Sequence, residues 1–239
     1  MVPITRKSWA LCGVEFALEL SPEVFVPTAT SECLAEAADV QPGDVVIDLG
    51  CGSGFFSILA AKRGAARVYA VDLMPQAVAL TQRNARHNGV ASCVHAVAGS
   101  LFEPLGDVRA DIVIDDVSGI AEEIARATPW YPATIPSGGA DGAGPTVQML
   151  EQVSGHLRPR GRLVFPVLSL ANEQRILESA QRMFSTLRLR SQRLFPIPST
   201  LQDVLEQLKA HLSQGTLRLI QRGSRLCWQL RVFEARAAA

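Results

Sequence analysis

Three closely spaced glycines follow an apolar run in the first half of the chain. The segment VVIDLGCGSG ends in Gly50, Gly52 and Gly54. Because glycine has no Cβ, it lets a backbone turn tightly and approach a ligand closely. Free amides at the start of a following helix would add hydrogen-bond donors to such a loop. The spacing predicts either a ligand-binding loop or a tight strand-to-helix turn that binds nothing.

An acidic residue, Asp72, lies near the end of the next apolar run, RVYAVDL. A carboxylate at this place can accept hydrogen bonds from the two hydroxyls of a ribose. The alternative is that Asp72 caps the helix expected to begin near MPQAV. Together with the three glycines, this acidic residue favours the ligand-binding interpretation.

Two adjacent carboxylates, Asp115 and Asp116, end a third apolar run, DIVIDD. Ligands of open α/β sheets bind at the carboxyl ends of strands, so the pair is placed to act on one. A carboxylate there can bind a cationic amine and remove its proton. Since neighbouring strand residues face opposite ways, only one of the two should face the ligand. A metal site is disfavoured, because no histidine or third carboxylate lies at ligand spacing.

The elements that position these residues alternate between strand and helix, which is typical of an α/β domain with a buried parallel sheet. The β-branched runs predict strands at 45–49, 67–73, 93–99, 111–116 and 162–168, and helical periodicity predicts helices at about 54–63, 76–88, 145–157 and 171–184. Beyond these, we expect strands at 187–194, 216–221 and 226–235, a helix at 201–212 and a hairpin turn at QRGSR. The length of 239 residues fits a single domain over 1–239, with a lead-in segment at 1–43.

Composition narrows the class of protein further. The chain has 23 Lys and Arg against 23 Asp and Glu and a mean hydropathy of +0.16, which excludes a disordered chain and gives no global attraction to nucleic acid or membrane. Its five cysteines form no CxxC pair, which is typical of a reducing compartment. We find neither a signal peptide nor a run of about 20 apolar residues, so a cytoplasmic location is expected.

The segments IDLGCGSG and VYAVDL resemble the class I S-adenosylmethionine-dependent methyltransferases, and the resemblance spans about residues 24–185. It implies a seven-stranded, mostly parallel sheet with helices on both faces and an antiparallel last strand. It also implies S-adenosylmethionine as the cofactor. The cofactor-binding residues that it implies are Asp48, Gly50, Cys51, Gly52 and Gly54 along the methionine part, Asp72 at the ribose, and Leu73, Ser100 and Leu101 around the adenine.

Two further segments narrow the resemblance. VFVPTATSE (24–32) is similar to the extended segment before the first strand in the release-factor glutamine methyltransferases and the broader small-methyltransferase group. IPSGGADG (135–142) is similar to a turn of the same group. That group carries Asn-Pro-Pro-Tyr after its fourth strand, whereas this chain has IDDVSG, with Asp115 at the asparagine position. By this position we expect Asp115 to face the cofactor or take part in catalysis, while Asp116 either contacts substrate or has a surface or helix N-cap role.

The methyl acceptor stays open at this stage. The acidic pair favours methylation of a polar or cationic nitrogen of a protein or small metabolite. RNA is the alternative that the C-terminal arginines favour and the neutral net charge opposes, and a cofactor-binding scaffold without methyl transfer is a third. Trp130 and Tyr131 are expected either to line a substrate pocket or to pack a loop down, and an insertion at 195–223 is expected to help close the pocket.

Overall fold

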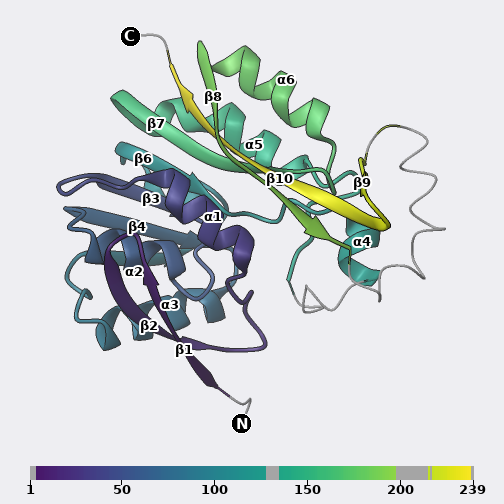
Figure 1. The fold of residues 1–239 in the computed structure, drawn as a ribbon. Helices are drawn as coiled ribbons and strands as arrows, with labels where there is room; N and C mark the ends of the chain where they lie inside the picture. Colours follow the sequence, from purple (N-terminus) through teal and green to yellow (C-terminus); the bar gives the residue numbers. More distant parts are fainter. Residues whose placement is uncertain (1–3, 128–134, 198–214, 216, 238–239) are drawn as a thin grey trace.

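The structure, a computed structural model, describes residues 4–127, 135–197, 215 and 217–237 (Figure 1). The strands are β1 (Thr5–Leu11), β2 (Val14–Leu20), β3 (Val45–Leu49), β4 (Arg67–Asp72), β5 (Val94–Ala98), β6 (Ala110–Asp115), β7 (Leu157–Leu168), β8 (Thr186–Pro196), β9 (Ile220–Arg222) and β10 (Arg225–Arg236). The α-helices are α1 (Ala29–Ala38), α2 (Phe55–Lys62), α3 (Pro75–His87), α4 (Glu122–Ala127), α5 (Gly144–Gln152) and α6 (Glu173–Met183), with short 3-10 turns at Glu103–Leu105 and Val153–His156.

One large sheet forms the centre of the molecule, in the order β5-β4-β3-β6-β7-β10-β8, with the short β9 beside β10. Strands β3 to β7 pair in parallel, whereas β10 runs antiparallel to both β7 and β8. The predicted α/β fold, with a mostly parallel sheet and an antiparallel last strand, is confirmed.

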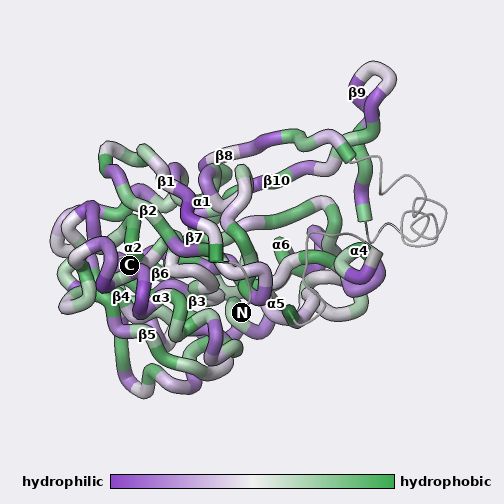
Figure 2. Tube along the Cα trace, turned by 90° about the horizontal axis from the view of Figure 1, so that it is seen from below, coloured by the Kyte–Doolittle hydropathy of each residue, from purple (hydrophilic) through white to green (hydrophobic). Residues whose placement is uncertain are grey.

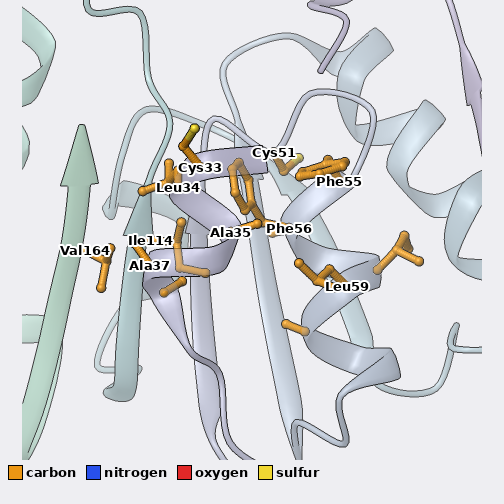
Figure 3. Packing of buried hydrophobic residues seen from close by; sticks show 14 of the residues in the cluster. Cys33, Leu34, Ala35, Ala37, Cys51, Phe55, Phe56, Leu59, Ile114 and Val164 are labelled. Atoms are coloured by element: carbon orange, nitrogen blue, oxygen red, sulfur yellow. The ribbon is translucent and has the colours of Figure 1, made fainter. Parts of the chain in front are cut away.

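Alternate side chains of the inner strands divide the core into two layers. Ile114 of β6 and Val164 of β7 belong to the layer under α1 and α2, and Figure 3 shows both beside the α1 side chains. Val113 and Phe165, one residue away on the same strands, pack in the layer that includes α5 and α6. Both faces of the sheet are therefore buried, which explains the continuous apolar runs in the sequence.

The N-terminal segment differs from the prediction. Strands β1 and β2 form a separate antiparallel hairpin that the sequence analysis missed, and Trp9 of β1 stacks on Phe16 and meets the edge of Phe55. The extended segment expected at 24–32 ends earlier, because α1 begins at Ala29. A capping box explains this start: the side chain of Thr28 accepts from the helix backbone while that of Ser31 accepts from the Thr28 amide.

The C-terminal strands match the prediction in part. The expected strands at 187–194 and 226–235 lie within β8 and β10, but of the one expected at 216–221 only the end is strand, in β9. The predicted turn joins β9 to β10 with Gly223 at φ 59°, and Figure 2 shows this hairpin projecting from the body with hydrophilic residues at its tip. The predicted helix at 201–212, Trp130, Tyr131 and most of the 195–223 insertion lie outside the described residues.

Within the described ranges, every helix is too short or too polar to cross a bilayer.

Candidate active site

A cavity of about 340 Å³ opens at the carboxyl ends of β3, β4 and β6. This is the edge at which the chain passes from strand to ligand-binding loop in open α/β sheets. Its walls come from the segment before and into α1, the glycine loop, the ends of β4 and β5, the segment after β6 and the turn before α5. The residues that line it include Phe25, Ser31, Gly50, Cys51, Gly52, Ser53, Asp72, Leu73, Ser100, Leu101, Asp116 and Ile120.

The glycine loop needs glycine for two different reasons. Gly50, Gly52 and Gly54 all have positive φ, at 77°, 53° and 85°. At Gly50 a Cβ would lie 2.8 Å from the Asp116 carbonyl oxygen, so the loop could not approach β6 as closely with any other residue. At Gly52 the nearest atom to a Cβ is the Phe25 carbonyl oxygen at 3.7 Å. Because Gly52 lines the cavity and no protein atom lies closer than 3.7 Å to the added Cβ, a side chain at this position would extend into the cavity.

Asp72 ties the glycine loop to the end of β4. Its Oδ2 accepts from the Gly52 amide and its Oδ1 from the Met74 amide, both at 2.9 Å. Burial raises the pKa of this carboxyl, although the two hydrogen bonds oppose the rise. Each carboxylate oxygen can accept a second hydrogen bond. The group thus supports the loop, touches the start of α3 and still presents acceptors to the cavity.

The other predicted cofactor residues divide into two groups. Cys51, Leu73, Ser100 and Leu101 line the cavity. Asp48 does not: it is fully buried behind the loop, where it accepts a hydrogen bond from the Ser57 hydroxyl in α2. Burial raises the pKa of Asp48 to about 7. Asp48 therefore supports the start of α2 from behind the loop, and its expected place along the methionine part stays a prediction.

The acidic pair faces the opposite way from the expectation. Asp116 lines the cavity, whereas Asp115 has no exposed surface and points into the layer that Val113 occupies. The expectation that Asp115 faces the cofactor is therefore wrong in its geometry. The alternation of β6 explains the outcome, because Asp116 continues the series of Ile112 and Ile114 toward α1.

Asp116 lies in acidic surroundings. Burial raises the pKa of its carboxyl well above the usual range, and the neighbouring carboxyls of Asp48 and Asp115 raise it further. The hydroxyl of Ser31, which is buried in α1, hydrogen-bonds to the group and opposes the rise. A positive charge that enters the cavity would favour the ionised form of Asp116.

The buried carboxyl of Asp115 is expected to make the stability of the folded protein depend on pH. Neither buried carboxylate oxygen makes a hydrogen bond of good geometry among the described residues, and burial raises the pKa of Asp115 from 3.8 to about 7 although the nearby Val117 amide opposes the rise. The native state therefore keeps a proton that the unfolded state has released. The contribution to stability is complete at low pH and is lost as the pH rises from the unfolded pKa toward the folded one.

We expect the wild type to lose up to about 1.4 kcal/mol per pH unit between about pH 4 and about pH 7 through this group, and Asp115→Asn to lack that slope. Urea unfolding of both proteins across this range measures it. The comparison uses slopes because the asparagine has its own, pH-independent, effect. Parallel curves would show that Asp115 ionises in its folded surroundings as it does in water.

The GGADG turn at 138–142 lies between two lining segments of the cavity, Ile135–Ser137 before it and Pro145 after it. The Gly138 amide donates to the Ile120 carbonyl at 2.9 Å, and Arg175 of α6 donates to both carboxylate oxygens of Asp141 at 3.1 and 3.0 Å. Burial raises the pKa of Asp141, but the Ala143 amide and Arg175 outweigh it and lower the pKa overall. Through these hydrogen bonds the turn connects the segment after β6 to α6.

The sequence analysis missed the residues that support the loop from α3. Thr81 and Asn84 are fully buried although both are polar, and both contact the glycine loop. The signal was present in the sequence: they stand three residues apart, on one face of a predicted helix, among the apolar positions. As for metals, the described part of the chain holds no cluster of three or more His, Cys, Asp or Glu side chains.

Several solved structures have a fold similar to that of this chain. A ribosomal protein L11 methylase from Lactobacillus delbrueckii subsp. bulgaricus matches 92% of this chain and 84% of its own, with a TM-score of 0.56 and 19% identity. A 16S rRNA methyltransferase from T. thermophilus, in complex with AdoMet and guanosine, matches 98% of this chain and 51% of its own, with a TM-score of 0.63 and 17% identity. At these identities the likeness concerns the fold.

The amino-acid sequence is similar to those of known methyltransferases. Residues 27–140 match the family described as ribosomal protein L11 methyltransferase (PrmA). The chain is 32% identical over 164 residues to a release factor glutamine methyltransferase from Geobacter sulfurreducens, covering 64% of this chain and 55% of that protein. It is 42% identical over 100 residues to a ribosomal protein L11 methyltransferase from Pelotomaculum thermopropionicum, covering 42% of this chain and 32% of that protein.

The glycine loop and these sequence matches support a class I S-adenosylmethionine-dependent methyltransferase, and the solved structures agree with its fold. Within that class it is similar to enzymes named for ribosomal protein L11 and for release factor glutamine. The chain spans between about a third and about half of the length of these two curated relatives.

Proposed function

We propose that this protein transfers the methyl group of S-adenosylmethionine to a polar or cationic nitrogen of a protein or small metabolite. One observation carries the proposal. Among the described residues, the charged side chains that line the cavity are Asp72 and Asp116, and neither lysine, arginine nor histidine is present in the lining. Such a site attracts a sulfonium cofactor and a cationic acceptor, and it repels a phosphate.

The cofactor is proposed to lie along the glycine loop. Asp72 would accept hydrogen bonds from the ribose hydroxyls, and Leu73 and Leu101 would flank the adenine, since all three line the cavity where the paired strands β4 and β5 end. Amides without a backbone partner at the start of α2 would supply donors for a carboxylate. When bound, the cofactor supplies an electrophilic methyl group on a positively charged sulfur.

The proposed work of the protein is to deliver a nitrogen with a free lone pair. Asp116 would bind the acceptor as a cation and take its proton, so that the lone pair is free to form the new N–C bond while the S–C bond breaks. The proton then passes from Asp116 to solvent, and the products are the methylated amine and S-adenosylhomocysteine. The apolar walls at Phe25 and Ile120 exclude water from the reacting atoms.

A protein acceptor has the stronger support. Both sequence relatives are named for protein substrates. An RNA acceptor would need unpaired cations. Among the described C-terminal arginines, several pair with glutamates, including Arg190, Arg193, Arg218 and Arg231, whereas Arg188, Arg222 and Arg225 form no ion pair there. A paired arginine contributes less to phosphate binding than a free one.

The proposal is tested with a cell extract separated into protein, RNA and small molecules. Each fraction is incubated with the enzyme and cofactor that carries an isotopically labelled methyl group, and the products are analysed by mass spectrometry. Label on a nitrogen in the protein or small-molecule fraction is the expected result. Label confined to RNA would replace the proposed acceptor, and cofactor binding without label in any fraction would leave a binding protein.

Asp72→Ala is expected to weaken the binding of S-adenosylmethionine and S-adenosylhomocysteine by about 1.5 to 3 kcal/mol, because charged hydrogen bonds to the ribose are lost. Isothermal titration calorimetry measures both affinities. Asp107→Ala, which removes an exposed carboxylate outside the cavity, is the control for the change in net charge. Equal affinities in the wild type and Asp72→Ala would remove Asp72 from the cofactor site.

A further inference from the structure

The inner face of α3 holds two consecutive carbonyl groups of the glycine loop. The Thr81 hydroxyl donates to the Gly52 carbonyl at 3.0 Å, and the Asn84 side-chain amide donates to the Ser53 carbonyl at 2.8 Å. Asn84 has no exposed surface and Thr81 has none either. Since buried polar groups persist when they are satisfied, these bonds fix the orientation of the loop's peptide planes.

The orientation has a consequence for the cavity. In a trans peptide, the carbonyl and the following N–H point in opposite directions. With the Gly52 carbonyl held toward α3 by Thr81, the N–H of Ser53 points away from α3, and Ser53 is part of the cavity wall. Among the described residues the structure gives this N–H no acceptor. The helix thereby presents a backbone donor of the loop to a ligand.

Asn84 also reaches in the other direction, to the N-terminal hairpin. Its Oδ1 accepts from the Glu19 amide at 2.8 Å and its Nδ2 donates to the Glu19 carbonyl at 3.0 Å. One side chain thus pairs with the edge of β2 as a neighbouring strand would, and its second N–H holds Ser53. The hairpin and the glycine loop are joined through a single buried amide.

Asn88, one turn later on α3, provides a natural comparison. Its Oδ1 accepts from the Ala17 amide at 3.2 Å and its Nδ2 donates to the Ala17 carbonyl at 2.7 Å, so it holds β2 in the same manner. Its remaining hydrogen bond goes to the Asn84 carbonyl, and the glycine loop is not among its partners. The two asparagines differ in the contact with the loop.

We propose that Asn84 is a positioning residue for the cofactor, which fixes the glycine loop in its binding conformation and joins that loop to the β1–β2 hairpin. The inference rests on the proposed function, because it assigns the loop to cofactor binding. It adds a role for residues outside the cavity: the hairpin stabilises the loop through Asn84, and Thr81 acts beside it on the preceding carbonyl.

The test compares Asn84→Ala with Asn88→Ala. Both variants remove two hydrogen bonds to β2, so both are expected to lower the melting temperature. Asn84→Ala alone is expected to weaken S-adenosylhomocysteine binding, by roughly 10-fold or more, because the loss of the bond to Ser53 frees the loop. Asn88→Ala should bind within about 2-fold of the wild type. Calorimetry is carried out well below the lower of the two melting temperatures.

Hydrogen exchange of residues 52–54 without ligand gives a second readout, and exchange is expected to be faster in Asn84→Ala than in Asn88→Ala. If Asn84→Ala does not fold, Thr81→Val replaces it, since valine keeps the shape and loses the donor to Gly52. Equal affinities and equal exchange in the two variants would overturn the inference. If the wild type binds no S-adenosylhomocysteine, the proposed function fails, while the exchange comparison still decides whether Asn84 holds the loop.

Discussion

Replacing Asp116 by asparagine is expected to lower turnover by about 100- to 10,000-fold, which is the scale of general-base catalysis. Asparagine keeps the shape of the side chain but neither binds a cation by charge nor accepts its proton. Affinity for the cofactor is expected to change much less, because Asp72 and the glycine loop provide that binding. If the acceptor is a cation, its apparent KM should rise as well.

The matched control is Asp115→Asn, one residue earlier on the same strand. It replaces the same type of side chain, a carboxyl group that is buried outside the cavity lining. Initial rates with the acceptor that the extract experiment identifies measure both variants. A large loss in Asp115→Asn with a small one in Asp116→Asn would reverse the assignment, and equal minor losses would show that backbone positioning alone carries the reaction.

The pH profile of the wild type bears on the same group. Burial beside Asp48 and Asp115 raises the pKa of Asp116, so the carboxylate that the proposed mechanism needs becomes more populated as the pH rises. The rate should therefore increase with pH on the acidic side of its optimum.

The inner strands and the glycine loop were predictable because local signals agree with the global fold. The run VVIDL is β3 residue for residue, and the strand expected at 111–116 is β6, one residue earlier at 110–115. A strand buried on both faces must be apolar throughout, and a glycine turn must follow it if the backbone approaches β6 closely. Both requirements can be recognised in the sequence, as an apolar run and as the glycines that follow it.

The orientation of the acidic pair was not predictable in this way. The strand period states that Asp115 and Asp116 face opposite sides, but which side holds the ligand depends on where α1 lies relative to the sheet. That is a property of the tertiary structure. The position of Asp115 in the motif of related enzymes pointed to the member of the pair that does not line the cavity.

The N-terminal hairpin was missed for a related reason. Glu15 and Glu19 interrupt the apolar character of the segment. Phe16, Leu18 and Leu20 nevertheless alternate with Glu15, Ala17 and Glu19, which is the pattern of a strand with one buried face. The hairpin also needs Asn84 and Asn88, which lie more than sixty residues away, to satisfy the outer edge of β2. Contacts at such separation carry no local signal.

Gly52→Val is expected to abolish cofactor binding while the sheet and its helices stay folded. The loop lies at φ 53° in this position, a region that a β-branched residue adopts only with strain, and the nearest protein atom to an added Cβ is 3.7 Å away. The added methyl groups would therefore occupy the space proposed for the ligand and would also disturb the amide that donates to Asp72. Gly89→Val supplies the control, because Gly89 also has a left-handed φ, of 69°, with nothing within 4 Å of an added Cβ and no part in the cavity. Calorimetry with S-adenosylhomocysteine and circular dichroism separate loss of binding from loss of fold. Wild-type affinity in a folded Gly52→Val protein would mean that the loop is a structural turn and that the cofactor lies elsewhere.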